Sequence, residues 1–160
     1  MRITDEEFWR TLQARRARVL GELRAREAET IALTELERLW YTCKFVVLEG
    51  DPASYFRIRE LFNSHRKGQL TFEEVKAGVF QCFTHALTCP VQEPNLLNLL
   101  THIWGFLRKH VHGEDDRAQV LRAIDALNGG DYTVVPDLYV LLDSLHFKYG
   151  KPNLLNPVLV

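Results

Sequence analysis

Polar side chains that could bind a ligand recur at helical spacing between residues 94 and 112. Separations of three or four residues place such side chains in one row along one face of a helix. The row consists of Asn95, Asn98, His102, Gly105, Lys109 and His112. Most other positions of this segment are apolar, so we expect the helix to be buried on most sides. Because an unpaired buried polar group costs roughly 1–3 kcal/mol, the row predicts either a binding site or very specific packing.

His102 is the strongest candidate for chemistry within this row. Asn98, one turn earlier, could orient one ring nitrogen and leave the other to accept a proton or a ligand atom. The alternative is a core histidine that holds a contact between two helices. Gly105 costs a helix roughly 1 kcal/mol relative to alanine. We therefore expect a close approach at Gly105, by a second helix as the commoner cause or by a ligand.

Basic residues form two clusters at the ends of predicted helices. One combines Arg57 and Arg59 with residues 65–67, and the other comprises Arg108, Lys109 and His110. The helix dipole alone favours cations at these ends, but converging clusters would form a phosphate-binding patch. Three aromatic residues could then offer a stacking surface: Trp104, Phe106 and Tyr139.

Lys44 is a further cation, placed between apolar neighbours near the end of the second predicted helix. Its stem either carries the ammonium to the surface or points it at the polar row, where it would meet an anionic ligand. Residues 51–113 carry seven basic and five acidic side chains and five of the six histidines. The central third is therefore the one region of this chain that could form a basic face.

Signatures of catalysis are mostly absent. The chain has no glycine-rich phosphate loop, no His-Glu-x-x-His motif, no nucleophile elbow and no cysteine set suited to an iron–sulfur cluster. Acidic residues 114–116 are typical of a helix start, where they complement the dipole. We therefore expect no catalytic residue, no metal site and no cofactor.

Composition indicates an ordinary soluble protein of the cytoplasm. The chain has 160 residues, 46% of them hydrophobic and 26% charged, with a formal net charge of −1. This charge gives no general case for binding nucleic acid or membranes. Cys43, Cys82 and Cys89 lack metal or disulfide spacing, so we expect reduced thiols. We expect neither a signal peptide nor a membrane-spanning segment.

Periodicity and capping signals predict an all-α, single-domain bundle of six to seven helices. A capping box at Thr4 and Glu7 opens the first helix, whose crowded arginines and glutamates we interpret as a solvated face rather than an RNA-binding arm. That face includes Arg15 and Arg16. The other helices are expected at about residues 34–48, 52–67, 72–88, 94–112, 114–127 and 136–149. Residues 132–135 are strand-like but too few for a sheet, and residues 152–160 are expected to lie against the bundle.

Three segments resemble, in order, the conserved core of the YbgA-like family, a bacterial family of unknown function. Residues 98–109 resemble its N-x-L-x-H-x-x-G-Y-F-K core, and residues 44–55 resemble its K-Y-L-L-M-A-H-S-P-x-x-Y segment. Residues 128–136, followed by Lys148 and Tyr149, are similar to its G-x-x-P-L-I-V-P…R-K-Y segment. Two positions depart from the family: Gly50-Asp51 replaces His-Ser, and a histidine expected after Val-Pro is absent or shifted to His146.

The resemblance divides the chain into an N-terminal charged amphipathic arm, residues 1–33, and a YbgA-like helical domain, residues 34–160. YbgA-like domains are sometimes fused to a desulfidase domain that removes sulfur from thiolated uracil in tRNA, and are thought to engage the RNA. The resemblance thus implies a non-catalytic accessory domain that binds tRNA or another structured RNA, with a separate desulfidase-type protein as a possible partner.

Two alternatives remain open: a small-molecule enzyme or sensor with His102 in a pocket, and an interaction module that forms a homodimer through the first helix. A deep, enclosed cavity at the polar row would favour the enzyme, whereas an open basic groove would favour RNA. The predicted ligand-binding residues are Lys44, Tyr55, Arg57, Asn95, Asn98, His102, Trp104, Arg108, Lys109 and Lys148.

Overall fold

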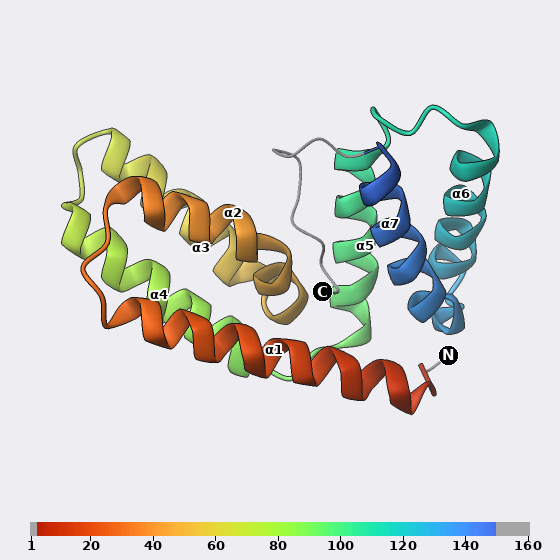
Figure 1. Ribbon diagram of the computed structural model, residues 1–160, viewed down its shortest axis with the longest axis horizontal. Helices are drawn as coiled ribbons and strands as arrows, with labels where there is room; N and C mark the ends of the chain where they lie inside the picture. Colours follow the sequence, from red (N-terminus) through yellow and green to blue (C-terminus); the bar gives the residue numbers. More distant parts are fainter. Residues whose placement is uncertain (1–2, 150–160) are drawn as a thin grey trace. The chain divides into compact units, whose positions relative to one another are not determined.

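The computed structural model describes residues 3–149, and this part of the chain is helical almost throughout (Figure 1). Seven α-helices and one short 3₁₀ helix make up its regular structure, which confirms the predicted all-α class. They are α1 (Glu6–Glu27), α2 (Leu33–Gly50), α3 (Pro52–Arg66), α4 (Phe72–Thr88), α5 (Glu93–Leu107), α6 (Glu114–Asn128), η1 (Tyr132–Val134) and α7 (Val135–Tyr149). The tail segment 152–160, for which we predicted packing against the bundle, lies outside the described residues.

The chain forms two units. The first contains residues up to Arg15 together with the chain from Gln92 onward, and the second contains residues 16–91. Helix α1 is part of both units: Phe8 packs edge-on against Tyr139 of the first unit, while Arg16 bonds to α2 and α4 of the second. The division into an arm of residues 1–33 and a domain of residues 34–160, which the family resemblance implies, remains a prediction.

Side-chain caps define the starts of three helices, α1, α3 and α4. Asp51 accepts a hydrogen bond from the Ser54 amide and is followed by Pro52, as the sequence predicts for the start of α3. Thr71 caps α4 by accepting from the Glu74 amide. The prediction for α1 was one residue early, because Asp5 rather than Thr4 accepts from the Phe8 amide.

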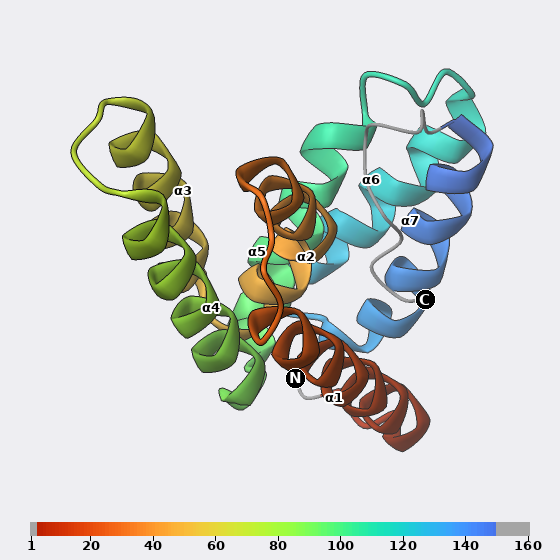
Figure 2. The same cartoon turned by 60° about the vertical axis from the view of Figure 1, so that its left-hand side comes forward.

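The second unit is built on pairwise packing of α2, α3 and α4, together with the rest of α1. Figure 2 shows α3 and α4 lying side by side. Every residue of α2 from Cys43 to Gly50 is buried, and Val75, Val79 and Phe83 of α4 are fully inaccessible to solvent. Arg15 and Arg16 are also buried, so the prediction that they lie on a solvated face of the first helix is wrong.

The first unit is built on α5, α6 and α7, which also pack pairwise. Residues 132–134, strand-like in composition, form the 3₁₀ helix that leads into α7. None of the helices within residues 3–149 has the length and apolar character needed to cross a bilayer.

Helix α5 ends at Leu107, five residues before the predicted end at His112. Residues 108–110 form a turn instead. The guanidinium of Arg117 in α6 donates hydrogen bonds to the carbonyls of Arg108 and Val111, at 2.7 and 3.1 Å. These bonds satisfy carbonyl groups that a continuing helix would otherwise use.

Candidate functional site

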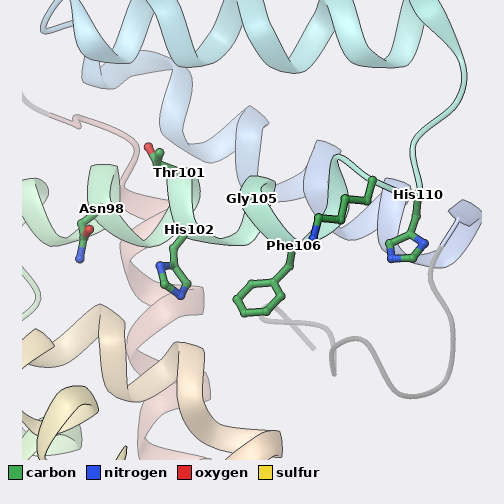
Figure 3. Close-up of a pocket in the computed structure, with 7 residues that line it drawn as sticks. Asn98, Thr101, His102, Gly105, Phe106 and His110 are labelled. Carbon is green, nitrogen blue, oxygen red and sulfur yellow. The ribbon is translucent and has the colours of Figure 1, made fainter.

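A hollow of about 510 Å³ follows the outer face of α5 and the turn after it (Figure 3). The described residues of its walls combine amide, hydroxyl, imidazole, aromatic and ammonium groups, with no carboxylate among them. The lining residues are Asn98, Thr101, His102, Gly105, Phe106, Lys109 and His110. Four of the six residues of the predicted polar row, Asn98, His102, Gly105 and Lys109, therefore border a recess within the first unit, whereas Asn95 and His112 do not line it.

The apolar face of α5 determines which side chains reach this hollow. Leu96, Leu99, Leu100, Ile103 and Leu107 are almost completely buried. Because these positions recur every three or four residues, they form one buried face, and the residues on the opposite side of the helix face outward. The expectation that α5 is buried on most sides is wrong, since Asn98, Thr101 and Gly105 are exposed.

His102 lies in the wall of the hollow, half-buried and on the same side of α5 as Asn98 and Phe106 (Figure 3). Its ring is tilted against that of Phe106, with 5.4 Å between the ring centroids. The two rings thus form a partly aromatic wall on the same side of α5 as the Asn98 amide. Asn95, one turn before Asn98, is half-buried and does not line the hollow.

Gly105 faces open space. A Cβ atom built on this residue would meet no heavy atom within 4 Å. The expected close approach of a second helix is therefore absent, and the missing side chain widens the hollow between His102 and Lys109.

The aromatic side chain available for stacking is Phe106, which is 36% exposed. Trp104 and Tyr139, also considered as stacking surfaces, are buried at 7% and 2% exposure. The guanidinium of Arg117 covers Trp104, 5.7 Å from its ring centroid. Trp104 thus belongs to the core beneath α5 rather than to the wall of the hollow.

Arg108 and Lys109 are exposed in the turn that follows α5, and Lys109 lines the hollow. Lys148, predicted as a further binding residue, lies elsewhere and pairs with Asp116 at 2.9 Å. Asp116 also accepts a hydrogen bond from the Tyr149 hydroxyl at 2.5 Å. The hydrogen bonds from Lys148 and Tyr149 lower the pKa of Asp116, and the bond to Asp116 raises the pKa of Lys148. This cluster holds the start of α6 against the end of α7.

The remaining predicted residues lie in the second unit. Lys44 is buried at 8% exposure, and its ammonium lies 5.3 Å from the Tyr41 ring centroid and 5.1 Å from that of Phe45. Burial, with a smaller contribution from the charge of Arg59, lowers the pKa of Lys44. Burial likewise raises the pKa of Tyr55.

Exposed aromatic and basic side chains also occur on α2 and α3. Tyr41 is 62% exposed and Phe56 is 53% exposed, while Arg57 and Arg59 are exposed on α3. Arg57 pairs loosely with Glu60 at 3.7 Å. Sequence analysis missed Tyr41 and Phe56, although two large aromatic side chains at the outer positions of amphipathic helices are a signal that could have identified them.

Within residues 3–149, no three His, Cys, Asp or Glu side chains group in a way that could hold a metal ion. Asp51, His85 and Cys89 come closest: His85 Nε2 lies 3.5 Å from both the Asp51 carboxylate and the Cys89 sulfur. In a catalytic triad, one ring nitrogen of the histidine contacts the nucleophile and the other contacts the acid that orients the ring. Here the same nitrogen, Nε2, is the one near both Asp51 and Cys89, so this geometry is not that of a triad.

A family model described as "Protein of unknown function (DUF1722)" matches residues 44–159. The chain belongs to the DUF1722 family. YbgA-like proteins are part of this family, so the resemblance read from the sequence is confirmed. The match begins at Lys44 and includes all of α3 to α7, and hence the whole lining of the hollow. No curated protein and no solved structure matched this DUF1722 protein.

Proposed function

We propose that this DUF1722 protein is a non-catalytic RNA-binding domain that engages tRNA or a similarly structured RNA. The observation that carries the proposal is the composition of the hollow along α5, where amide, hydroxyl, aromatic and ammonium groups meet without a carboxylate. Unstacked bases in RNA are bound by stacking on aromatic side chains and by hydrogen bonds to their edges.

Each type of side chain in the hollow has a role in this proposal. Phe106 provides a face on which a base stacks. The Asn98 amide and the Thr101 hydroxyl donate to and accept from base edges or a ribose hydroxyl. Lys109 neutralises a phosphate of the RNA. Because Lys109 lies in a turn, its side chain can reach the sugar-phosphate backbone of the RNA. Gly105 leaves room for the nucleotide.

The exposed aromatic and basic residues of the second unit provide a further surface of the same chemistry. Tyr41 and Phe56 would stack on bases, and Arg57 and Arg59 would contact phosphates. Lys44 and Tyr55 support this surface from beneath, because both are buried. The near-neutral net charge means that affinity depends on these local groups rather than on the field of the whole protein.

A small-molecule sensor is the second candidate, favoured by the volume of the hollow, which lies within the range of about 300–1,000 Å³ typical of ligand pockets. The exposure of Asn98 and Lys109 speaks for the longer, open binding mode of RNA. Homodimerisation through the first helix and a separate desulfidase-type partner remain predictions. A cytoplasmic location is part of the proposal, since tRNA is found there.

A filter-binding titration with bulk tRNA at low salt tests the proposal. We expect binding that weakens steeply as salt rises. Phe106→Ala should weaken it by about five- to 150-fold, the range for loss of one stacked base. Lys109→Ala should also reduce the slope of the salt dependence by about one. Arg122→Ala, which removes an exposed cation of α6 outside the hollow, is the matched control.

The proposal fails if wild-type protein shows no affinity for tRNA at low salt, or if all three variants bind as wild type does. Tight binding of a mononucleotide that competes fully with tRNA would favour the sensor.

A further inference from the structure

A second hollow of about 510 Å³ lies between the first turns of α1 and the length of α7, within the first unit. Residues from both helices line it: Asp5, Glu7, Phe8, Thr11, Pro136, Asp137, Tyr139, Val140, Asp143, Ser144 and Phe147. Four of these side chains are carboxylates and none is cationic. This composition is the reverse of that of the hollow along α5.

The floor and one wall of this acidic hollow are apolar and accessible to a partner. Phe8 packs edge-on against Tyr139, with 5.2 Å between the ring centroids. Val140 and Phe147 are seven residues apart and therefore lie on the same face of α7. They are 62% and 74% exposed. Exposed apolar side chains gathered within a polar rim are typical of protein interaction sites.

Contacts within the first unit hold the start of α1, which forms one side of the hollow. The Ile3 amide donates to Glu93 of α5 at 2.7 Å, and the Trp9 indole donates to the Ile3 carbonyl at 3.1 Å. These bonds, with the Phe8–Tyr139 contact, hold the start of α1 against the rest of the first unit. A preformed site loses less entropy on binding than a mobile one.

The charge of the rim determines which partner fits. Asp5, Glu7 and Asp137 lie near helix starts, where the dipole favours acids, whereas Asp143 lies in the middle of α7. Four carboxylates repel RNA and anionic lipid. A symmetric contact with a second copy would bring the carboxylates of one chain against those of the other.

We propose that the acidic hollow docks a positively charged amphipathic helix of a partner protein. Apolar side chains of that helix pack on Phe8, Val140 and Phe147, and its lysine or arginine side chains face the four carboxylates. This is the helix-in-groove mode of recognition, in which apolar residues give affinity and the flanking charges give orientation. The site is independent of the proposed RNA-binding hollow and shares no lining residue with it.

Two designed helical peptides with the same leucine face test the proposal, one with lysine and one with glutamate at the polar positions. We expect the lysine peptide to bind the full chain at low salt in a fluorescence anisotropy titration, and the glutamate peptide not to bind. Asp137→Asn combined with Asp143→Asn should weaken binding roughly ten-fold by removing two ion pairs. Phe147→Ser should weaken it at least as much, without changing affinity for tRNA.

Leu121→Ser is the matched control, because Leu121 is 46% exposed on α6 and lies outside the hollow; this variant should bind the lysine peptide as wild type does. Circular dichroism of each variant shows whether it is folded. Three results would overturn the proposal: no binding of the lysine peptide, equal binding of the two peptides, or equal binding by wild type and Phe147→Ser. Self-association of the wild-type chain that Phe147→Ser abolishes would also overturn it and assign this face to a second copy.

Discussion

Arg16 and Glu49 form an ion pair that is inaccessible to solvent. The Arg16 Nη1 atom lies 3.0 Å from the Glu49 carboxylate, and the two side chains are 2% and 0% exposed. The same guanidinium donates to the backbone carbonyls of Val46 at 3.1 Å and Ala86 at 2.5 Å. One side chain therefore connects α1 to both α2 and α4, and the second unit depends on it.

Arg16→Ala should reduce the free energy of unfolding by about 3–5 kcal/mol, because it removes the buried guanidinium that pairs with the Glu49 carboxylate and donates to two backbone carbonyls. Urea unfolding measured by circular dichroism checks this value. Arg18→Ala is the control, since its pair with Glu22 at 3.7 Å is exposed and should contribute no more than about 0.5 kcal/mol. A similar decrease in the free energy of unfolding of both variants would show that the buried Arg16 pair contributes no more to stability than the exposed Arg18 pair.

Gly50→Ala should destabilise the protein by about 3 kcal/mol or more. A Cβ atom on Gly50 would overlap the Ala86 carbonyl oxygen and lie 2.5 Å from Arg16 Nη2. The Ala86 oxygen belongs to the backbone of α4, so it can move away only if α2 and α4 separate. Gly21→Ala, where a Cβ meets nothing within 4 Å, should instead stabilise by about 0.5–1 kcal/mol. Melting temperatures of the two variants should thus shift in opposite directions.

The helices could be predicted from sequence because their signals are local. Capping side chains such as Asp51 and Thr71 and the spacing of apolar residues act within one or two turns, and they gave most boundaries to within two residues. Arg16 shows where this reasoning fails. Its partners are 33 and 70 residues away along the chain, so nothing near it distinguishes it from the solvated Arg18.

The site was predicted in part for the same reason. The row from Asn98 to Lys109 follows from helical periodicity, and the structure brings it to one hollow. The early end of α5 could not be predicted, because Arg117 of α6 causes it. The roles of Trp104 and Phe106 were not separable either, since only the packing of α5 on its neighbours shows which aromatic ring is covered.

Gly105→Ala should stabilise the protein and weaken RNA binding at the same time. A helix gains about 1 kcal/mol when alanine replaces glycine and meets no clash, and none is present at Gly105. The added methyl group projects into the space that the proposed nucleotide occupies. The melting temperature of Gly105→Ala should therefore rise while its affinity for tRNA falls. Gly21→Ala should raise the melting temperature without changing the affinity for tRNA. Stabilisation with unchanged tRNA affinity would place the bound RNA elsewhere.

His146 should make the protein less stable in mild acid. Its Nδ1 atom is buried without a hydrogen-bond partner, and burial lowers the pKa of the ring below its usual value of 6.5. The unfolded chain therefore takes up a proton at a higher pH than the folded chain does. Stability is fully present above pH 6.5 and is lost as pH falls from there through the lowered pKa.

The measurement is the melting temperature between pH 7.5 and 5. Wild type should lose stability over this range, and His146→Leu, which cannot be protonated and leaves no unpaired buried nitrogen, should lose markedly less. His112→Leu, at an exposed histidine, controls for the removal of an imidazole and should retain the wild-type slope. The expected difference between wild type and His146→Leu depends entirely on the burial of the His146 ring. If the melting temperatures of the two proteins fall in parallel as pH is lowered, other groups cause the acid sensitivity.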